Sequence, residues 1–184
     1  MEYDLIRSSR KTISAQIKAG RLILRVPRRA TKAQIEAFLQ AHRRWIETHL
    51  AKSQAQKKHA AALPKLTSAD IQALKARAQE VIPERVAYYA PIVGVSVGTI
   101  TIRCQKTLWG SCSGEGNLSF NCLLMLAPAE VLDSVVVHEL CHRKEMNHSQ
   151  RFYREVLRVM PDYYRHHLWL REQGQMLLAR VETK

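Results

Sequence analysis

The residues best suited to chemistry lie in one short segment, His138-Glu139-Leu140-Cys141-His142. Its two histidines are four residues apart, so on a helix both imidazoles lie on one face, one turn apart, and can reach the same metal ion. Glu139 lies about 100° around the helix from His138. From that position a carboxylate can accept a proton from water without being a metal ligand. The spacing therefore predicts a metal site in which Glu139 is the general base.

A catalytic zinc site needs a third protein ligand and keeps one position for water. The first candidate is His148, six residues after His142, which completes the H-E-x-x-H-x-x-x-x-x-H spacing of metzincin-type sites. Metzincins carry a glycine midway in this segment, where this chain has Glu145. The alternative is Glu155, in the next predicted helix, which would follow the gluzincin pattern. We expect one Zn²⁺ held by His138, His142 and His148, and no other cofactor.

The helix that carries the motif is predicted to run from Pro128 to about Glu145, and it continues an apolar stripe through Val131 and Val135. Ser149 is expected to cap the following helix. Further elements are predicted from periodicity and turn residues: strands at 95–103, 108–113 and 117–121, a helix from Ser68 that kinks or restarts at Pro83, and a last helix over 161–180. The strand at 117–121 is interpreted as a free edge to which an extended peptide could add.

The first third of the chain has a different pattern. Strands are predicted at 3–7, 12–17 and 21–26, with a turn over residues 18–20, followed by a helix that Thr31 caps and that runs to about residue 52. Residues 53–66 are polar and are interpreted as a linker. The order predicts an α+β protein with two parts: a basic β-hairpin-plus-helix module over 1–60, with a linker to about 66, and a catalytic domain over 67–184.

Charge is distributed unevenly between these parts. The 184 residues include 29 Lys and Arg against 16 Asp and Glu, a net charge of +13. Residues 1–60 hold 14 of these basic residues and only 4 acidic ones. Such asymmetry indicates either a docking surface for an anionic partner, such as nucleic acid or a nucleotide, or a solvated face that keeps the protein soluble. With 46% hydrophobic residues, the composition excludes a disordered, collagen-like or coiled-coil chain.

Nothing in the sequence predicts a membrane protein. No segment approaches the roughly 18 apolar residues that a membrane helix needs, and the acidic start Met1-Glu2-Tyr3-Asp4 does not have the order of a secretory signal. The four cysteines form no CxxC pair. We therefore expect a cytoplasmic protein with free thiols. The oligomeric state is not predicted.

Several sequence blocks together resemble the YgjP-like, zincin-type metallopeptidase family, which is related in motif to the SprT-like and WLM groups. The matching blocks are Val26-Pro27 with Trp45-Ile46, Trp109-Gly110-Ser111-Cys112-Ser113, residues 116–121, Leu126-Ala127-Pro128, residues 135–142, Asn147-His148-Ser149 with Phe152, and residues 161–170. The resemblance implies a minimal zincin-like catalytic domain, with a small mixed sheet, an active-site helix and C-terminal helices. It also implies Zn²⁺ on His138, His142 and His148 with Glu139 as general base. The family often has Phe-Trp after the Asn147-His148-Ser149 block, where this chain has Phe152-Tyr153.

Three functions remain open at this point. The first is a zinc-dependent peptidase that acts on a peptide or protein. The second keeps the metal chemistry but acts on a phosphate-bearing molecule such as a nucleotide, for which the positive charge is the only argument. The third is a nucleic-acid-associated module with structural zinc. A group that stabilises the oxyanion is also expected, with candidates at Tyr163, Tyr164, Arg165 and His166.

Overall fold

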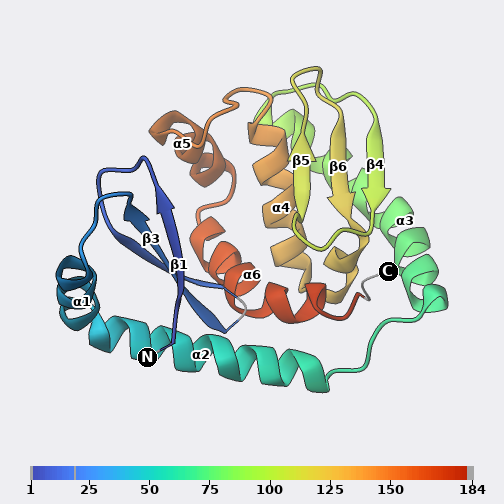
Figure 1. Cartoon of the computed structure of the whole chain (residues 1–184). Coiled ribbons are helices and arrows are strands. Elements are labelled where there is room, and N and C mark those ends of the chain that lie inside the picture. Colours follow the sequence, from blue (N-terminus) through green and yellow to red (C-terminus); the bar gives the residue numbers. More distant parts are fainter. Residues whose placement is uncertain (1, 19, 182–184) are drawn as a thin grey trace. The chain divides into compact units, whose positions relative to one another are not determined.

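The computed structural model describes residues 2–18 and 20–181 and divides into two compact units, residues 1–63 and 64–184 (Figure 1). Both units combine helices with a three-stranded mixed sheet. The α+β class predicted from the sequence is therefore confirmed. Among the described residues, no helix has both the length and the apolar composition needed to cross a bilayer.

The first unit packs a small sheet against two helices. Its elements are β1 (Asp4–Ser8), β2 (Ser14–Lys18), β3 (Arg21–Pro27), α1 (Lys32–Ala41) and α2 (Arg43–Ala62). Strand β3 lies in the centre, parallel to β1 and antiparallel to β2. The predicted hairpin is therefore β2–β3, although Ala19 in its turn lies outside the described residues. Thr31 forms the capping box of α1 with Gln34.

Alternation along β3 decides which face of this sheet is buried. Leu22, Leu24 and Val26 are buried and pack with Ile35 and Ile46 of the two helices. The residues between them point to the opposite face, because successive side chains of a strand alternate. The open face of the sheet thus carries Arg21 and Arg25, both exposed.

The predicted linker is wrong for most of its length. Residues 53–62 continue α2 as regular helix, and the single helix predicted over 31–52 is two helices that meet at His42. The segment has no apolar stripe, which is why periodicity did not indicate a helix. Its Ala, Gln and Lys residues nevertheless have high intrinsic helix propensity.

The second unit contains the candidate site. Its elements are α3 (Ser68–Val93), β4 (Ile100–Arg103), β5 (Gly110–Cys112), β6 (Leu118–Asn121), the 3₁₀ helix η1 (Cys122–Leu126), α4 (Ala129–Cys141), α5 (Gln150–Val159) and α6 (Tyr163–Leu178). Thr67, rather than Ser68, caps α3. The helix passes through Pro83 without a break and ends at Gly94, whose φ of 81° is the left-handed conformation that favours glycine at a helix end.

Sheet order corrects one sequence interpretation. The strands are arranged β4-β6-β5, with β6 parallel to β4 and antiparallel to β5. Strand β6 covers most of the segment 117–121, which was interpreted as a free edge, but it is paired on both sides. The edge strands are β4 and β5; within the described part of the chain β5 pairs with β6 alone, and it contacts α4.

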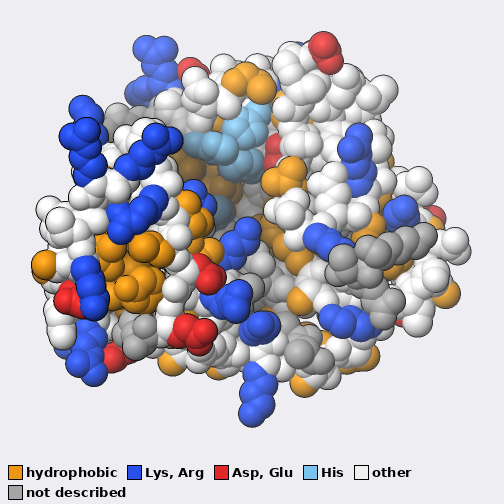
Figure 2. All heavy atoms as spheres, viewed as in Figure 1, with side chains coloured by type: hydrophobic (Ala, Val, Ile, Leu, Met, Phe, Trp, Pro, Cys, Tyr) orange, Lys and Arg blue, Asp and Glu red, His pale blue; other side chains and the backbone are white. Residues whose placement is uncertain are grey.

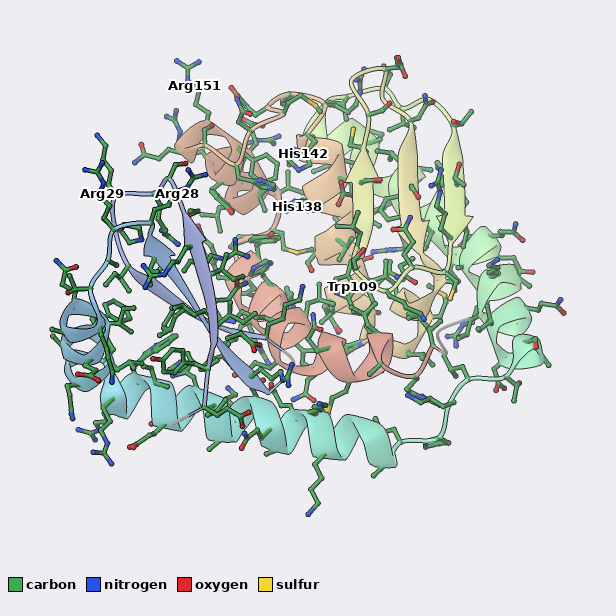
Figure 3. The ribbon with its side chains drawn as sticks, in the orientation of Figure 1. Arg28, Arg29, Trp109, His138, His142 and Arg151 are labelled. Carbon is green, nitrogen blue, oxygen red and sulfur yellow. The ribbon has the colours of Figure 1, made fainter. Side chains whose placement is uncertain are left out.

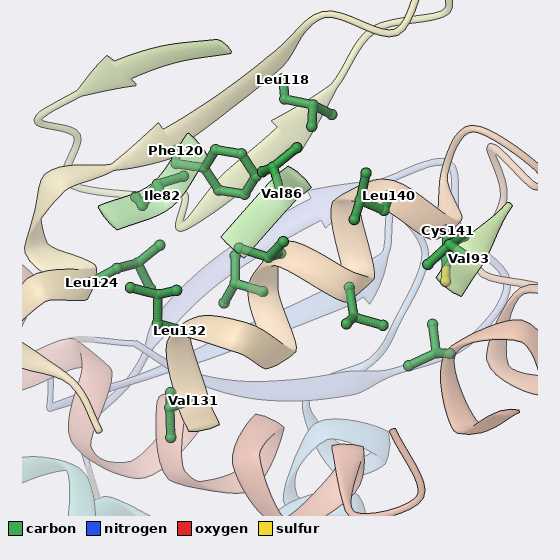
Figure 4. Close-up of a cluster of buried hydrophobic side chains, with 14 of the residues drawn as sticks. Ile82, Val86, Val93, Leu118, Phe120, Leu124, Val131, Leu132, Leu140 and Cys141 are labelled. Carbon is green, nitrogen blue, oxygen red and sulfur yellow. The ribbon is translucent and has the colours of Figure 1, made fainter. Parts of the chain in front are cut away.

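Helix α4 forms the centre of this unit (Figure 1). It contacts α3, α5, α6, β5 and η1, so almost its whole surface is buried. The buried cluster around it includes Ile82, Val86, Leu118, Phe120 and Leu140 (Figure 4). Val135-Val136-Val137 are weak helix formers, and here tertiary packing outweighs that preference because all three side chains are buried.

One partly buried ion pair joins α3 to α4. Arg85 donates two hydrogen bonds of 2.7 Å to the carboxylate of Asp133, and the Tyr89 hydroxyl donates a third at 3.1 Å. Asp133 is only 9% exposed. Bidentate pairing of this kind fixes orientation as well as distance. The pair therefore sets the rotation of α4 against α3, and with it the direction in which the motif residues point.

Candidate metal centre

Three imidazoles of the second unit converge on one point. The Nε2 atom of His138 lies 3.2 Å from that of His142 and 3.0 Å from that of His148. For a tetrahedral zinc ion with Zn–N bonds near 2.05 Å, the expected N···N separation is about 3.3 Å. These two separations are close to that value, and the ligand atoms of His138, His142 and His148 all lie within 4.8 Å of one another. Figure 3 labels the first two on α4, and Figure 2 shows histidine side chains reaching the surface there.

The other nitrogens of two of these rings are held by hydrogen bonds. His138 Nδ1 lies 2.8 Å from the Tyr163 hydroxyl, and His142 Nδ1 lies 3.1 Å from the carbonyl oxygen of Glu145. Since a carbonyl can only accept, His142 Nδ1 carries the proton and its Nε2 keeps a lone pair. Such outer partners fix the tautomer and ring orientation of metal-binding histidines.

The segment between the second and third histidines is anchored at both ends. Arg143 donates to the carbonyl oxygens of Ser96 and Gly114, at 3.2 and 2.9 Å. Lys144 forms a 3.0 Å ion pair with Glu155. Ser149 caps α5 as predicted, by accepting from the backbone N–H of Phe152. The chain can therefore leave α4 after Cys141 and return His148 to the cluster within six residues.

An aromatic floor supports the histidines. Phe152, which is fully buried, stacks on His142 with ring centroids 4.5 Å apart and meets His138 and His148 edge-on, each at 4.9 Å. Phe152 contacts all three rings and has no atom that could act as a ligand. Phe152 thus holds the rings in place without competing for a ligand position.

Glu155, the alternative third ligand, is engaged elsewhere. Its carboxylate binds Lys144 and Arg158, at 3.0 and 3.1 Å, and these cations hold the pKa of Glu155 below its usual value. It is not part of the histidine cluster. Cys141, set aside from the sequence as a ligand, is buried in the core as expected.

Glu139 lies in an apolar environment beside the cluster. It is 5% exposed, and burial raises the pKa of its carboxyl to about 8. With His138 it lines a cavity of about 150 Å³. Gly110 of β5 lies against it, since a Cβ at Gly110 would come within 2.6 Å of Glu139 Oε1. Only glycine lets the edge strand approach the carboxylate this closely.

The same burial acts in the opposite direction on the histidines. It is the main cause that lowers the pKa of His138 to about 3, with smaller contributions from His142 and His148. The pKa of His142 is lowered for the same reason. Both rings are therefore neutral at physiological pH, which is the state that binds metal ions.

Of the four residues suggested from the sequence as oxyanion-stabilising groups, Tyr163 is the one that contacts the cluster. It is 3% exposed, and its hydroxyl is bonded to His138 of the cluster. Tyr164 is 55% exposed. The sequence analysis did not single out His167, whose Nδ1 lies 3.5 Å from the Tyr163 hydroxyl. Its four-residue spacing from Tyr163 on α6 was the available signal.

A protein-family model described as "YgjP-like, metallopeptidase domain" matches this chain over residues 11–70 and 61–173. The chain belongs to the YgjP-like metallopeptidase family. This confirms the resemblance noted from the sequence blocks and makes the chain a member of a hydrolase family. The match includes the histidine cluster and Glu139 as well as most of the first unit.

Two solved structures are similar to part of the chain. They are the metallopeptidase zymogens abylysin of Pyrococcus abyssi, at 20% identity and a TM-score of 0.47, and jannalysin of Methanocaldococcus jannaschii, at 21% and 0.45. In each case the similar region is 52% of this chain. It is 97% of the abylysin chain and 98% of the jannalysin chain. A comparison with curated proteins gave no match.

Proposed function

We propose that the protein is a zinc-dependent peptidase in which His138, His142 and His148 bind one Zn²⁺ and Glu139 is the general base. The observation that carries the proposal is the convergence of three Nε2 atoms while Nδ1 of His138 and of His142 is held by other groups. Membership of a metallopeptidase family supports peptides as substrates. The cytoplasmic location stays a prediction from the sequence.

The donor set fits a catalytic rather than a structural zinc site. Structural sites are closed by four protein ligands, usually with cysteines. Among the described residues, the cluster holds three histidines and no fourth His, Cys, Asp or Glu. This argues against the nucleic-acid-associated module with structural zinc.

When bound at these nitrogens, a divalent cation would polarise a substrate carbonyl, acidify water and lower the pKa of the nearby carboxyl. The protein's own part is positional. Glu139 would take a proton from the attacking water and pass it to the leaving amine. With a cation on Nε2, His138 Nδ1 would donate to the Tyr163 hydroxyl, which orients the ring, and Phe152 keeps the rings converged. The open side of β5 offers backbone groups to an extended peptide next to Glu139.

The test compares metal content and hydrolysis in matched variants. Glu139→Gln should keep its zinc and lose activity on peptides by about 10²–10⁴-fold, the usual range for a general acid–base group. Glu130→Gln, an exposed glutamate in the first turn of the same helix, is the control and should behave as wild type. His148→Ala should lose zinc, whereas Glu155→Ala should retain it. Full activity of Glu139→Gln would disprove the assigned role.

The phosphohydrolase alternative is tested in the same assay. Nucleoside triphosphates are offered alongside the peptides, with Glu139→Gln as the common control. The excess positive charge that favoured this alternative lies mainly in residues 1–60. Hydrolysis of triphosphates without hydrolysis of peptides would replace the peptidase proposal.

We also propose that the first unit binds nucleic acid through the open face of its sheet. On that face Arg21 lies opposite Lys18 in the β2–β3 register, and Arg25 lies opposite Ser14. The hydroxyl of Ser14 accepts a 2.7 Å hydrogen bond from Arg10. Four cations therefore lie on this side of the sheet, where Arg21 is also 3.8 Å from the Asp4 carboxylate, and this excess of positive charge suits a phosphate backbone. Only four acidic residues occur in residues 1–63 to offset the charge.

Salt dependence tests this second proposal. With about four phosphate contacts to a single strand, the logarithm of the binding constant should fall with the logarithm of salt concentration with a slope near −3. Arg25→Glu should weaken binding and flatten that slope. Arg77→Glu, an exposed arginine of α3, makes the same change in net charge and should have little effect. Equal losses in both variants would exclude a specific surface.

A further inference from the structure

The cavity beside Glu139 has a composition that selects for one kind of substrate group. It measures about 150 Å³ and belongs entirely to the second unit. Trp109, Val135 and Leu170 supply its apolar walls. These residues come from the segment before β5, from α4 and from α6, so three separate elements build the cavity around the carboxylate.

The polar groups in the lining are mostly engaged with other partners. The Ser134 hydroxyl donates to the carbonyl oxygen of Val131 at 2.7 Å, and the Tyr163 hydroxyl is bonded to His138. His167 is exposed to solvent, and Glu139 is the proposed general base. Polar groups that are already paired offer little to a polar ligand, which would lose its own hydrogen bonds to water on entering.

The described lining of this cavity favours apolar over anionic groups. No lysine or arginine is among the described residues that line it, and its titratable side chains are His138, Glu139, Tyr163 and His167. A phosphate or an acidic side chain would therefore find no lysine or arginine partner in the described lining. The cationic surface of the first unit and this cavity therefore suit different ligands.

From this arrangement we infer that the cavity is a specificity pocket for an apolar side chain, up to about the size of a phenyl ring, on the residue next to the scissile bond. An apolar cavity of about this volume holds a benzene molecule. Because His138 and Glu139 form part of the wall, a side chain in the pocket places its own backbone at the proposed reacting groups. The inference rests on the proposed peptidase function and gives its substrate class: peptides with leucine, isoleucine, methionine or phenylalanine beside the cleaved bond.

Cleavage of a peptide mixture randomised at one position at a time tests the preference. One position flanking the cleaved bond should favour Leu, Met or Phe over Asp, Lys or Gly by at least about 10-fold in kcat/KM, because a single methylene in an apolar pocket already changes this ratio about 10- to 200-fold. Val135→Ile, which adds a methylene to the wall, should shift the preference from Phe towards Val and Ala by about 10-fold.

Val137→Ile is the matched control. Val137 lies on the same helix and is fully buried, but it does not line the cavity. The readout is a ratio between two peptides in one reaction, so any loss of folded protein cancels. An unchanged ratio in Val135→Ile, or an equal shift in Val137→Ile, would overturn the assignment.

A binding measurement separates this inference from the proposed function. The zinc-loaded protein is titrated with N-acetyl-phenylalaninamide and, separately, with N-acetyl-aspartamide, and the NMR signals of the Trp109 indole and the Leu170 methyl groups are followed. Only the phenylalanine probe should move them. Peptide cleavage without an apolar preference overturns the pocket and keeps the peptidase; selective probe binding without any cleavage overturns the peptidase and keeps the pocket. Failure of both measurements overturns both.

Discussion

Replacing Tyr163 with phenylalanine removes one hydroxyl from the support of the metal site and changes little else. The hydroxyl lies 2.8 Å from His138 Nδ1, and the side chain is 3% exposed, so water has little access to replace it. When Nε2 of His138 binds metal, Nδ1 carries the ring proton and donates to this oxygen. Tyr163→Phe keeps the ring in the core and leaves that proton without an acceptor.

The size of the effect follows from two general figures. Loss of an outer hydrogen-bond partner typically weakens metal affinity by about 10–100-fold, which is about 1.4–2.7 kcal/mol. Leaving one buried donor unpaired costs about 1–3 kcal/mol. The two ranges overlap near 2 kcal/mol, so we expect zinc affinity to fall by about 30-fold.

The assay is competition for zinc with a chromophoric chelator at pH 7, with Tyr164→Phe as control. Tyr164 is the next residue, is 55% exposed and undergoes the same chemical change. A second readout, ¹⁵N chemical shifts of His138, reports the tautomer and should show a mixture only in Tyr163→Phe. Affinity within about twofold of wild type, or an equal loss in Tyr164→Phe, would refute the positioning role.

Three further predictions follow from the same contacts. In the metal-free protein, the pKa of Glu139 is raised from 4.5 to about 8, so the folded state keeps a proton that the unfolded state loses above pH 4.5. The free energy of unfolding therefore falls as the pH rises from 4.5 to about 8. In denaturant titrations, Glu139→Gln should therefore be more stable than wild type by about 3 kcal/mol at pH 7, relative to their difference at pH 4; parallel pH profiles would contradict this. Gly110→Ala should lower kcat with zinc content unchanged, because its Cβ would displace the Glu139 carboxylate, whereas Gly114→Ala, with open space around it, should be neutral in the same kinetic assay. Asp133→Ala should destabilise the fold by about 2–3 kcal/mol, below the 3–5 kcal/mol of a fully buried pair because the Arg85 side chain is 36% exposed; a change under about 0.5 kcal/mol in urea unfolding would show that the pair is dispensable.

The features that the sequence predicted well are those set by local spacing. The four-residue separation of His138 and His142 determines that they share a helix face, and the Ser149 cap determines where the next helix begins. Neither depends on distant parts of the chain. The same reasoning brought His148 forward as third ligand, and the structure brings all three rings together, although their binding of metal stays a proposal.

The features that the sequence missed depend on contacts between distant segments. Tyr163 was suggested as an oxyanion-stabilising residue, but packing of α6 on α4 directs its hydroxyl to His138 Nδ1, 25 residues earlier. Nothing near Gly110 in the sequence indicates that it lies against Glu139. Strand β6 looked like a free edge because sequence order puts it last, whereas the parallel crossover from β4 places it in the centre.

Burial beside the histidine cluster connects the packing of α4 to the proposed chemistry. The apolar environment keeps His138 neutral and ready to bind a cation, and it also keeps Glu139 protonated when no cation is present, since its pKa is about 8. A carboxyl in that state cannot accept a proton. A positive charge nearby favours the ionised form, so the proposed general base should become ionised mainly when the site is loaded. The valine-rich core of α4 thus makes Glu139 depend on the same ion that the histidines are proposed to hold.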